Sequence, residues 1–195
     1  MTAPIEKHGV AFAGENPMIV LYQQRPGGDE CVAIASLWRS AYSAAGEGHA
    51  LVIWVDPVAS GFGDLAPIGI YTDNLDLARL VWTNFYQDYD LIHNRGIDDS
   101  PPHTARFVYQ ADGRRLHRFA CSTGTTTIEL EWRDAQEPFQ SITYLTGYEV
   151  SVVACPCPRA SIAVNGQIVP GEVRLPHGVF KSSAILAFAE TWIER

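Results

Sequence analysis

The sequence predicts an α+β fold made mainly of antiparallel strands, with a curled or barrel-like sheet, one or two helices and an aromatic-lined cavity. Three observations lead to this prediction. Short apolar segments bounded by Gly and Pro turns are frequent, above all after Thr104. A single segment carries a convincing helical stripe, and strands do not alternate with helices, which disfavours a doubly wound parallel sheet. We expect one β-rich domain over residues 1–195.

The first third of the chain contains apolar segments of strand length. Three of them are Met18–Gln23, Ala50–Val55 and Ile68–Thr72. The segment Glu30–Ala45 fits either a helix, because of its alanines, or a strand, because apolar residues alternate from Val32 to Trp38. We favour the strand slightly. The Pro- and Gly-rich stretches Arg25–Gly28 and Asp56–Pro67 read as surface connections.

One helix is expected in the middle of the chain. Asp73 or Asn74 is suited to cap a segment that runs to about Tyr89, because both side chains accept hydrogen bonds from the first free N–H groups. Apolar residues such as Leu77 and Val81 recur at helical spacing and make a broad stripe. The polar stretch His93–His103 then forms a further loop.

The second half of the sequence has a repeated strand pattern. The expected strands are Thr104–Gln110, Arg114–Cys121, Thr125–Arg133, Gln140–Leu145, Tyr148–Ala154, Ser161–Val164 and Gln167–Val169. An Asp-Gly turn joins the first pair, and Asn165-Gly166 suits a type I′ turn between the last pair, since both central residues need positive φ. The last segment, 183–195, fits a strand or a helix.

Charge and cysteine content exclude several classes of protein. A formal net charge of −8 disfavours nucleic acid and anionic membrane surfaces, because both require a basic face. No apolar run approaches the length of a membrane span, and Met1–Gly14 contains no apolar core of signal-peptide length. The four scattered cysteines predict reduced thiols and a cytoplasmic location. The sequence does not decide between a monomer and a homo-oligomer.

No cofactor or metal is expected. Gly61-x-Gly63 lacks the third glycine and the lysine of a phosphate loop, and no nucleophile elbow is present. Cys155-Pro-Cys157-Pro has a spacing of one residue, whereas zinc knuckles need two to four and a second ligand pair. We therefore predict no stoichiometric metal and read the two cysteines as small apolar residues of a strand end.

Glu190 is the leading candidate for catalysis because it interrupts an apolar run. At period two, one face contains Ala184, Leu186, Phe188, Glu190 and Trp192. If the run is buried, a low-dielectric site would favour the protonated carboxyl, which is what a general acid needs. The alternatives are a salt bridge to Arg106 or Arg118, or exposure near the chain end.

Two further residues are candidates for acid–base roles. His117 alternates with Phe119 on a strand and would be a proton shuttle if that face lined a cavity; the alternative is a satisfied or solvent-facing histidine. Asp73 lies where a strand becomes a helix, a position that often faces a pocket, although helix capping explains it equally.

Aromatic residues suggest the kind of ligand. Five Trp, eight Tyr and eight Phe occur mostly on strands and on the helical stripe, and a curled sheet lined with aromatics is a typical container for a small apolar molecule. The substrate-binding candidates are Tyr71, Trp82, Phe119, Phe188 and Trp192. Most aromatics simply build core, which is the competing interpretation.

In outline the chain is similar to calycin and lipocalin-like barrels, and to the small α+β barrels of cofactor-free isomerases and lyases. No stretch matches a motif of those families, so no functional residue is carried over. The sequence leads us to expect a cofactor-independent lyase, isomerase or hydratase acting on a small apolar substrate, such as a terpenoid or its epoxide. The alternatives are a non-catalytic carrier or sensor of a hydrophobic ligand and a structural, partner-binding domain.

Overall fold

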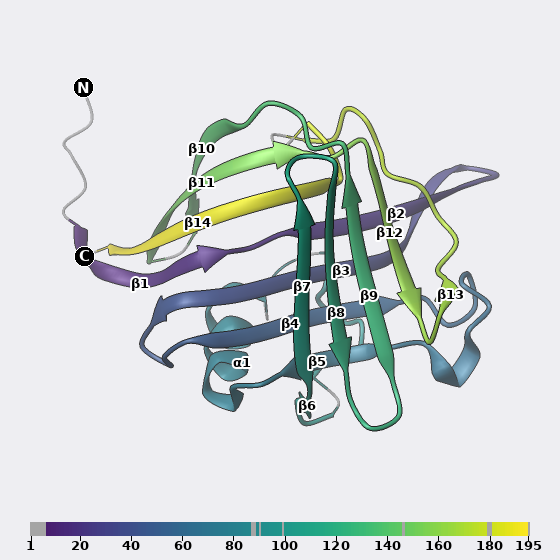
Figure 1. Ribbon diagram of the computed structural model, residues 1–195, viewed down its shortest axis with the longest axis horizontal. Helices are drawn as coiled ribbons and strands as arrows, with labels where there is room; N and C mark the ends of the chain where they lie inside the picture. The colour runs from purple at the N-terminus through teal and green to yellow at the C-terminus, as the bar shows by residue number, and fades with distance from the viewer. Residues whose placement is uncertain are drawn as a thin grey trace.

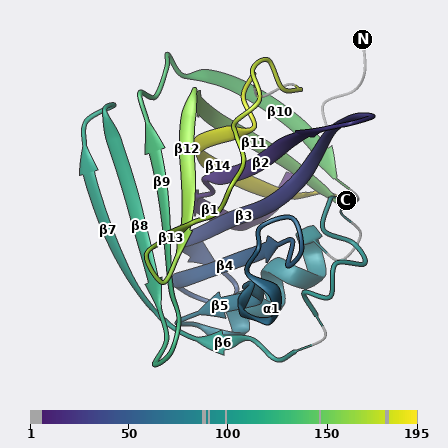
Figure 2. The same cartoon turned by 90° about the vertical axis from the view of Figure 1, so that its right-hand side faces the viewer.

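Two antiparallel sheets pack face to face, and a helix covers the outer face of the larger one (Figures 1 and 2). The computed structural model describes residues 7–86, 89, 91–98, 100–145, 147–178 and 181–194. Over these residues the fold is α+β and mainly antiparallel, with a curled, barrel-like large sheet and a single α-helix, as the sequence predicts.

The large sheet has nine strands within the described residues. They are β1 (Lys7–Glu15), β2 (Met18–Arg25), β3 (Gly28–Ser43), β4 (Gly48–Val55), β5 (Ile68–Thr72), β6 (His103–Thr104), β10 (Phe139–Leu145), β11 (Tyr148–Pro156) and β14 (Ala184–Glu194). Their order is β10-β11-β14-β1-β3-β4-β5-β6, and β2 pairs with both β14 and β3. All pairs are antiparallel except β5 with β6.

The pairings of β1, β14, β2 and β3 close into a small four-strand circuit. Strands β1 and β2 follow each other between the same two neighbours and are interrupted at Asn16 and Pro17. The amide of Asn16 donates to the hydroxyl of Ser36 (3.2 Å) and to the carbonyl of Leu37 (3.1 Å). These two bonds give the Ser36 hydroxyl and the Leu37 carbonyl of β3 a partner. They do so at the point where Pro17, which has no N–H, interrupts the hydrogen bonding between strands.

In the described part of the chain, the small sheet has five strands in the order β13-β12-β9-β8-β7. They are β7 (Arg106–Asp112), β8 (Leu116–Ser122), β9 (Thr127–Arg133), β12 (Arg159–Val164) and β13 (Gln167–Ile168). Figure 1 shows β7, β8, β9 and β12 crossing steeply over the strands of the large sheet. Strand β7 is the edge of the small sheet, so the large sheet continues uncovered beyond it (Figure 1).

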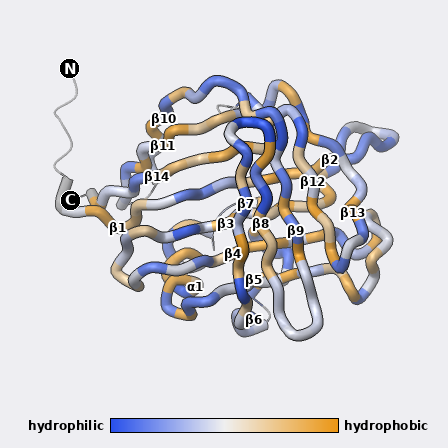
Figure 3. Tube along the Cα trace, in the orientation of Figure 1, coloured by the Kyte–Doolittle hydropathy of each residue, from blue (hydrophilic) through white to orange (hydrophobic). Residues whose placement is uncertain are grey.

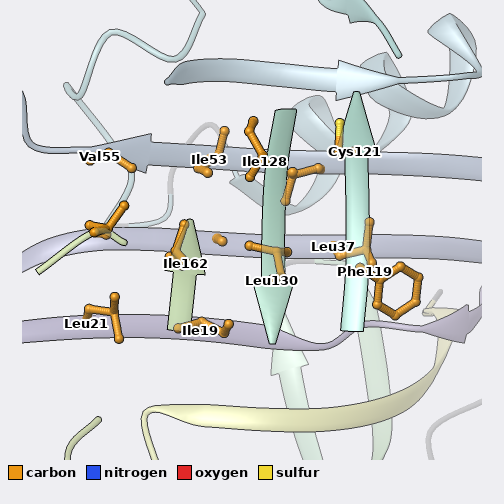
Figure 4. Close-up of a cluster of buried hydrophobic side chains, with 14 of the residues drawn as sticks. Ile19, Leu21, Leu37, Ile53, Val55, Phe119, Cys121, Ile128, Leu130 and Ile162 are labelled. Atoms are coloured by element: carbon orange, nitrogen blue, oxygen red, sulfur yellow. The ribbon is translucent and has the colours of Figure 1, made fainter. Parts of the chain in front are cut away.

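The interface between the sheets is one of two hydrophobic cores. Figure 4 shows Ile19, Leu37 and Ile53 of the large sheet facing Phe119 and Leu130 of the small sheet. Strand β9 alternates buried and half-buried positions, as a two-faced strand should. The hydropathy colouring of Figure 3 shows the same alternation of apolar and polar residues along these strands.

The second core lies between the large sheet and α1 (Leu75–Val81), which continues as a π-helical segment, Trp82–Tyr86. Asn74 caps α1, since its side-chain oxygen accepts from the backbone N–H groups of Asp76 and Leu77. Burial raises the pKa of Tyr86 to about 12. A short 3₁₀ turn, Gly63–Leu65, lies in the long connection after β4.

The structure settles the open secondary-structure questions. Glu30–Ala45 lies largely within β3, and the segment 183–195 is β14 over Ala184–Glu194, so both are strands. The helical segment is described as far as Tyr86, residues 87–88 lie outside the described residues, and Tyr89 is not helical. The strand β1 was not predicted, because its glycines leave only a short apolar pattern around Val10 and Phe12. In the described part of the chain no helix is long and apolar enough to cross a membrane.

Candidate functional site

A row of side chains crosses the large sheet beneath the edge of the small sheet. Its members are paired directly from strand to strand: Phe188 with Glu15, Glu15 with Arg39, and Arg39 with His49. Asp73, just after β5, is bonded to His49 and completes the row. Residues in direct register point to the same face of a sheet, so the row presents these side chains to one side.

His49 and Asp73 form a dyad at the polar end of this row. One carboxylate oxygen of Asp73 lies 2.7 Å from Nδ1 of His49, and the other accepts the backbone N–H of His49 at 2.6 Å. A carboxylate can only accept, so Nδ1 carries the proton and Nε2 holds the free lone pair of the neutral ring. Among the described residues, Nε2 has no hydrogen-bond partner.

Phe107 of β7 covers the imidazole of His49. The two rings are stacked, with centroids 4.8 Å apart and an interplanar angle of 15°. One side of the dyad is therefore dry, while the side chains of His49 and Asp73 keep 25% and 37% of their surface exposed. A base that is both oriented and accessible is suited to proton transfer.

Glu15 and Arg39 form the central part of the row. Nη1 of Arg39 lies 3.1 Å from Oε1 of Glu15, and the guanidinium carbon lies 5.8 Å from the ring centroid of Tyr109. Gly14 makes the close approach of β1 and β3 possible, because a Cβ at this position would lie 2.1 Å from the carbonyl oxygen of Arg39. A β-bulge in β3 follows at this point of the ladder.

A second dyad, Tyr109 with His117, lies on the small sheet. The phenol oxygen of Tyr109 is 2.6 Å from Nδ1 of His117, and Nε2 is 2.7 Å from the carbonyl of Gly113. That carbonyl can only accept, so Nε2 donates and Nδ1 of the neutral ring accepts the phenol proton. Burial raises the pKa of Tyr109, Glu15 raises it further, and Arg39 opposes the rise.

These side chains line an open groove with two lobes. The polar lobe, about 660 Å³, is bordered by Glu15, Arg39, Glu47, His49 and Asp73, among others. The apolar lobe, about 250 Å³, is the aromatic-lined part of the cavity; its lining includes Tyr109, His117, Phe119, Leu186 and Phe188. Glu15 and Phe188 line both lobes, so the lobes adjoin along the Glu15–Phe188 pair.

Four of the residues proposed from the sequence lie in this groove. His117, Phe119 and Phe188 line the apolar lobe, and Asp73 and Phe188 line the polar one. The structure assigns His117 a fixed hydrogen-bonded position rather than a free shuttle nitrogen, because both of its ring nitrogens are bonded. Asp73 does not cap the helix, since Asn74 does so.

The basis for choosing Glu190 was wrong. Its side chain is exposed and does not lie in a low-dielectric site. The small sheet covers Ala184 and Leu186 of the same face but ends before Glu190, which neighbours Ala13 and Ser151 on the paired strands. Within the described residues no ion pair involves Glu190, so exposure near the chain end is the alternative that the geometry supports.

The other three proposed binding residues lie outside the groove. Tyr71 is buried under the small sheet and contacts His103 in a tilted arrangement, with ring centroids 4.8 Å apart. Trp82 borders a separate hollow of about 440 Å³ between α1 and the loop that precedes β6. Trp192 is half-buried on β14, opposite Val10.

The cysteines show no metal-binding arrangement. In the part of the chain that the structure describes, no group of three or more His, Cys, Asp or Glu side chains could hold a metal ion. Cys157 is buried and its thiol lies 3.6 Å from the carbonyl of Cys155. The absence of a resident metal stays a prediction for elemental analysis.

Sequence reasoning missed groove residues that matter for its chemistry, among them Glu15, Arg39, Glu47, His49 and Tyr109. His49 and Asp73 are 24 positions apart, and only the pairing of β4 with β5 brings them together. The signal available in the sequence was the alternation of His49 with Leu51 and Ile53, which places His49 on the face of the first core.

Comparison with known proteins adds no assignment. No protein-family model matches the chain, and no curated protein has a matching sequence. The groove therefore has to be interpreted from its own chemistry.

Proposed function

We propose that the protein is an acid–base enzyme of the lyase, isomerase or hydratase class that acts on a small, largely apolar molecule. The observation that carries this proposal is the His49–Asp73 dyad, both residues of which line a groove that adjoins an apolar lobe. The proposal keeps the reaction class expected from the sequence and moves the acid–base role from Glu190 to His49.

The proposed step needs only proton transfers. Nε2 of His49 takes a proton from the bound molecule, and the carboxylate of Asp73 stabilises the resulting imidazolium through Nδ1. The imidazolium, whose Nε2 proton exchanges with water, then protonates another atom of the substrate in an isomerisation, or a leaving oxygen in an elimination. A hydration runs the elimination in reverse.

Tyr109 lines the apolar lobe that adjoins the dyad's lobe. Its phenol donates to Nδ1 of His117, so towards a ligand its oxygen is an acceptor. The raised pKa of Tyr109 keeps the phenol neutral at physiological pH. Phe119 stacks on Tyr109 with centroids 4.4 Å apart and holds the ring in place.

The test is incubation with a panel of small apolar alcohols, epoxides and alkenes in D₂O, followed by mass spectrometry. Turnover should give products, or recovered substrates, with carbon-bound deuterium, and His49→Asn should lose about 10²-fold or more of that rate. Deuterium incorporation that His49→Asn leaves unchanged would refute the assignment of the base.

A non-catalytic carrier or sensor is the second candidate. It is favoured by the apolar lobe, where Phe119, Leu186 and Phe188 offer a surface for a hydrophobic group. The same panel separates the two functions, because a carrier would shift the melting temperature with a ligand and produce nothing from it.

We also propose a reducing compartment such as the cytoplasm. All four cysteines are free. Burial raises the pKa of the Cys121 and Cys157 thiols to about 12, so both stay protonated and unreactive inside the first core.

A further inference from the structure

The polar lobe carries an excess of negative charge. Its charged lining consists of three carboxylates, Glu15, Glu47 and Asp73, and one guanidinium, Arg39. With the carboxylates ionised and His49 neutral, one positive charge against three negative ones leaves the lobe with two net negative charges. The protein as a whole is also acidic, with a formal charge of −8, which attracts cations toward such a groove.

Arg39, the cationic side chain in the lining of the polar lobe, already has an ion-pair partner. Arg39 is paired with Glu15 at 3.1 Å and lies near the ring of Tyr109. A carboxylate or phosphate ligand would have to compete with Glu15 for that guanidinium while facing the remaining carboxylates. Like charges at short range disfavour such binding.

The hydrogen-bonding groups open to a ligand are mostly acceptors. Nε2 of His49 has a free lone pair when Nδ1 donates to Asp73. Oε2 of Glu15 and the carboxylate of Glu47 have no partner among the described residues. A ligand that donates several N–H bonds matches this set, and an ammonium group carries three donors and no acceptor.

Aromatic side chains lie next to these acceptors. Tyr109 and Phe188 border the apolar lobe that continues beyond Glu15, and Phe188 also lines the polar lobe. Aromatic faces attract cations and also accept apolar groups. The groove thus offers a site for a positive head and, alongside it, a pocket of about 250 Å³ for an apolar group.

We propose that the ligand of this groove is a small amphipathic cation, a protonated amine with an apolar tail. The head lies among Glu15, Glu47 and His49, and the tail lies against Phe119 and Phe188. This ligand would be the substrate of the proposed enzyme, so the proposal rests on that function in using the same groove. It concerns binding alone and does not require turnover.

The test compares three probes of similar shape by calorimetry: phenethylamine, phenethyl alcohol and phenylacetate. At neutral pH and low salt, phenethylamine should bind about tenfold or more tightly than phenethyl alcohol, and phenylacetate should bind weakest. The preference for the amine over the alcohol should shrink as salt is added, because screening weakens the charge attraction.

Variants identify the residues responsible. Glu15→Gln should reduce phenethylamine affinity about tenfold, raise phenylacetate affinity by releasing Arg39, and leave phenethyl alcohol unchanged. Asp64→Asn is the matched control, because it removes one exposed carboxylate from a 3₁₀ turn outside the groove. It should leave all three affinities unchanged.

Equal affinities for the amine and the alcohol, tighter binding of phenylacetate, or no detectable binding of phenethylamine would overturn the proposal. So would an equal loss of phenethylamine affinity in Glu15→Gln and Asp64→Asn. Amine selectivity in a protein that turns over no substrate would refute the proposed enzyme and leave the ligand class intact. Turnover that depends on His49 without amine selectivity would refute the ligand class and leave the proposed enzyme intact.

Discussion

Glu15 and Phe188 are directly paired on β1 and β14, and both border the polar lobe and the apolar lobe of the groove. A charged and an aromatic side chain therefore lie together where the two lobes adjoin. Phe188 keeps 45% of its surface exposed, so it contributes little to the core and is free to contact a ligand.

This position gives the first prediction. Phe188→Ala should weaken binding of phenethyl alcohol by about three- to tenfold, because the tail loses an aromatic contact. The melting temperature should fall only slightly. Val108→Ala is the control, since Val108 is a largely exposed hydrophobic residue of β7 outside the groove lining. Isothermal titration measures the affinity of both variants for phenethyl alcohol. Identical affinities of Phe188→Ala and Val108→Ala would show that the ligand does not use the apolar lobe.

The second prediction concerns the turn between β12 and β13. Asn165 has φ +50° and Gly166 has φ +81°, which confirms the type I′ turn expected from Asn-Gly. Gly166→Val should destabilise the fold by about 1–2 kcal/mol through backbone strain. Gly124→Val is the matched control, because both positions have open space around a Cβ and only Gly166 has positive φ. In urea titration, Gly166→Val should unfold at a lower midpoint than Gly124→Val. Equal midpoints would contradict the strain argument.

The third prediction concerns the helix cap. The side-chain oxygen of Asn74 accepts two backbone N–H groups of α1, and its amide donates to the carbonyls of Ala45 and Glu47. Asn74→Ala should cost about 1–3 kcal/mol, because it removes the cap and the tie between α1 and the β3–β4 turn. Arg79→Ala on the same helix breaks only an exposed pair with Asp76 and should cost less than about 1 kcal/mol. Thermal denaturation of the two variants tests the difference.

The fourth prediction uses Cys155 as a reporter of the groove. Cys155 lines the apolar lobe, and burial raises the pKa of its thiol although Arg114 opposes the rise. Because the thiolate is the reactive form and is scarce below the pKa, alkylation by iodoacetamide should accelerate about tenfold for each unit of rising pH near neutrality. Phenethyl alcohol should protect Cys155 and leave Cys31, which lies outside the groove, unprotected. Peptide mass mapping distinguishes the two sites, and equal protection would contradict the assigned position of the ligand.

Local sequence signals predicted most of the fold. Alternation along Thr125–Arg133 identified a two-faced strand, observed as β9, and Asn165-Gly166 identified the turn between β12 and β13. These signals work because strand periodicity and positive φ act within a few residues. Strand β1 was not predicted because Gly9 and Gly14 weaken its apolar pattern. Its burial comes from β3 and β14, which are distant in the sequence.

The site was only partly predictable for the same reason. Alternation correctly put Glu190 on the face of Leu186, but the sequence contains no signal for where the covering sheet ends. The small sheet ends at the edge strand β7, and Glu190 remains exposed to solvent. The same strand provides Phe107, which stacks on His49. The partner that makes His49 a candidate base, Asp73, is set by strand pairing and not by spacing.

The central claim is that the acid–base centre is the His49–Asp73 dyad and not Glu190. The most direct measurement replaces each carboxylate by its amide, Asp73→Asn and Glu190→Gln, and determines melting temperature and turnover per folded molecule on the same preparations. Asp73→Asn should stay folded and lose about 10²-fold or more in kcat, because Nδ1 of His49 loses the charge that stabilises its imidazolium. Glu190→Gln should melt and turn over like the parent protein, since its side chain is exposed and unpaired among the described residues. A Glu190→Gln variant that folds but loses activity, while Asp73→Asn remains active, would contradict this account.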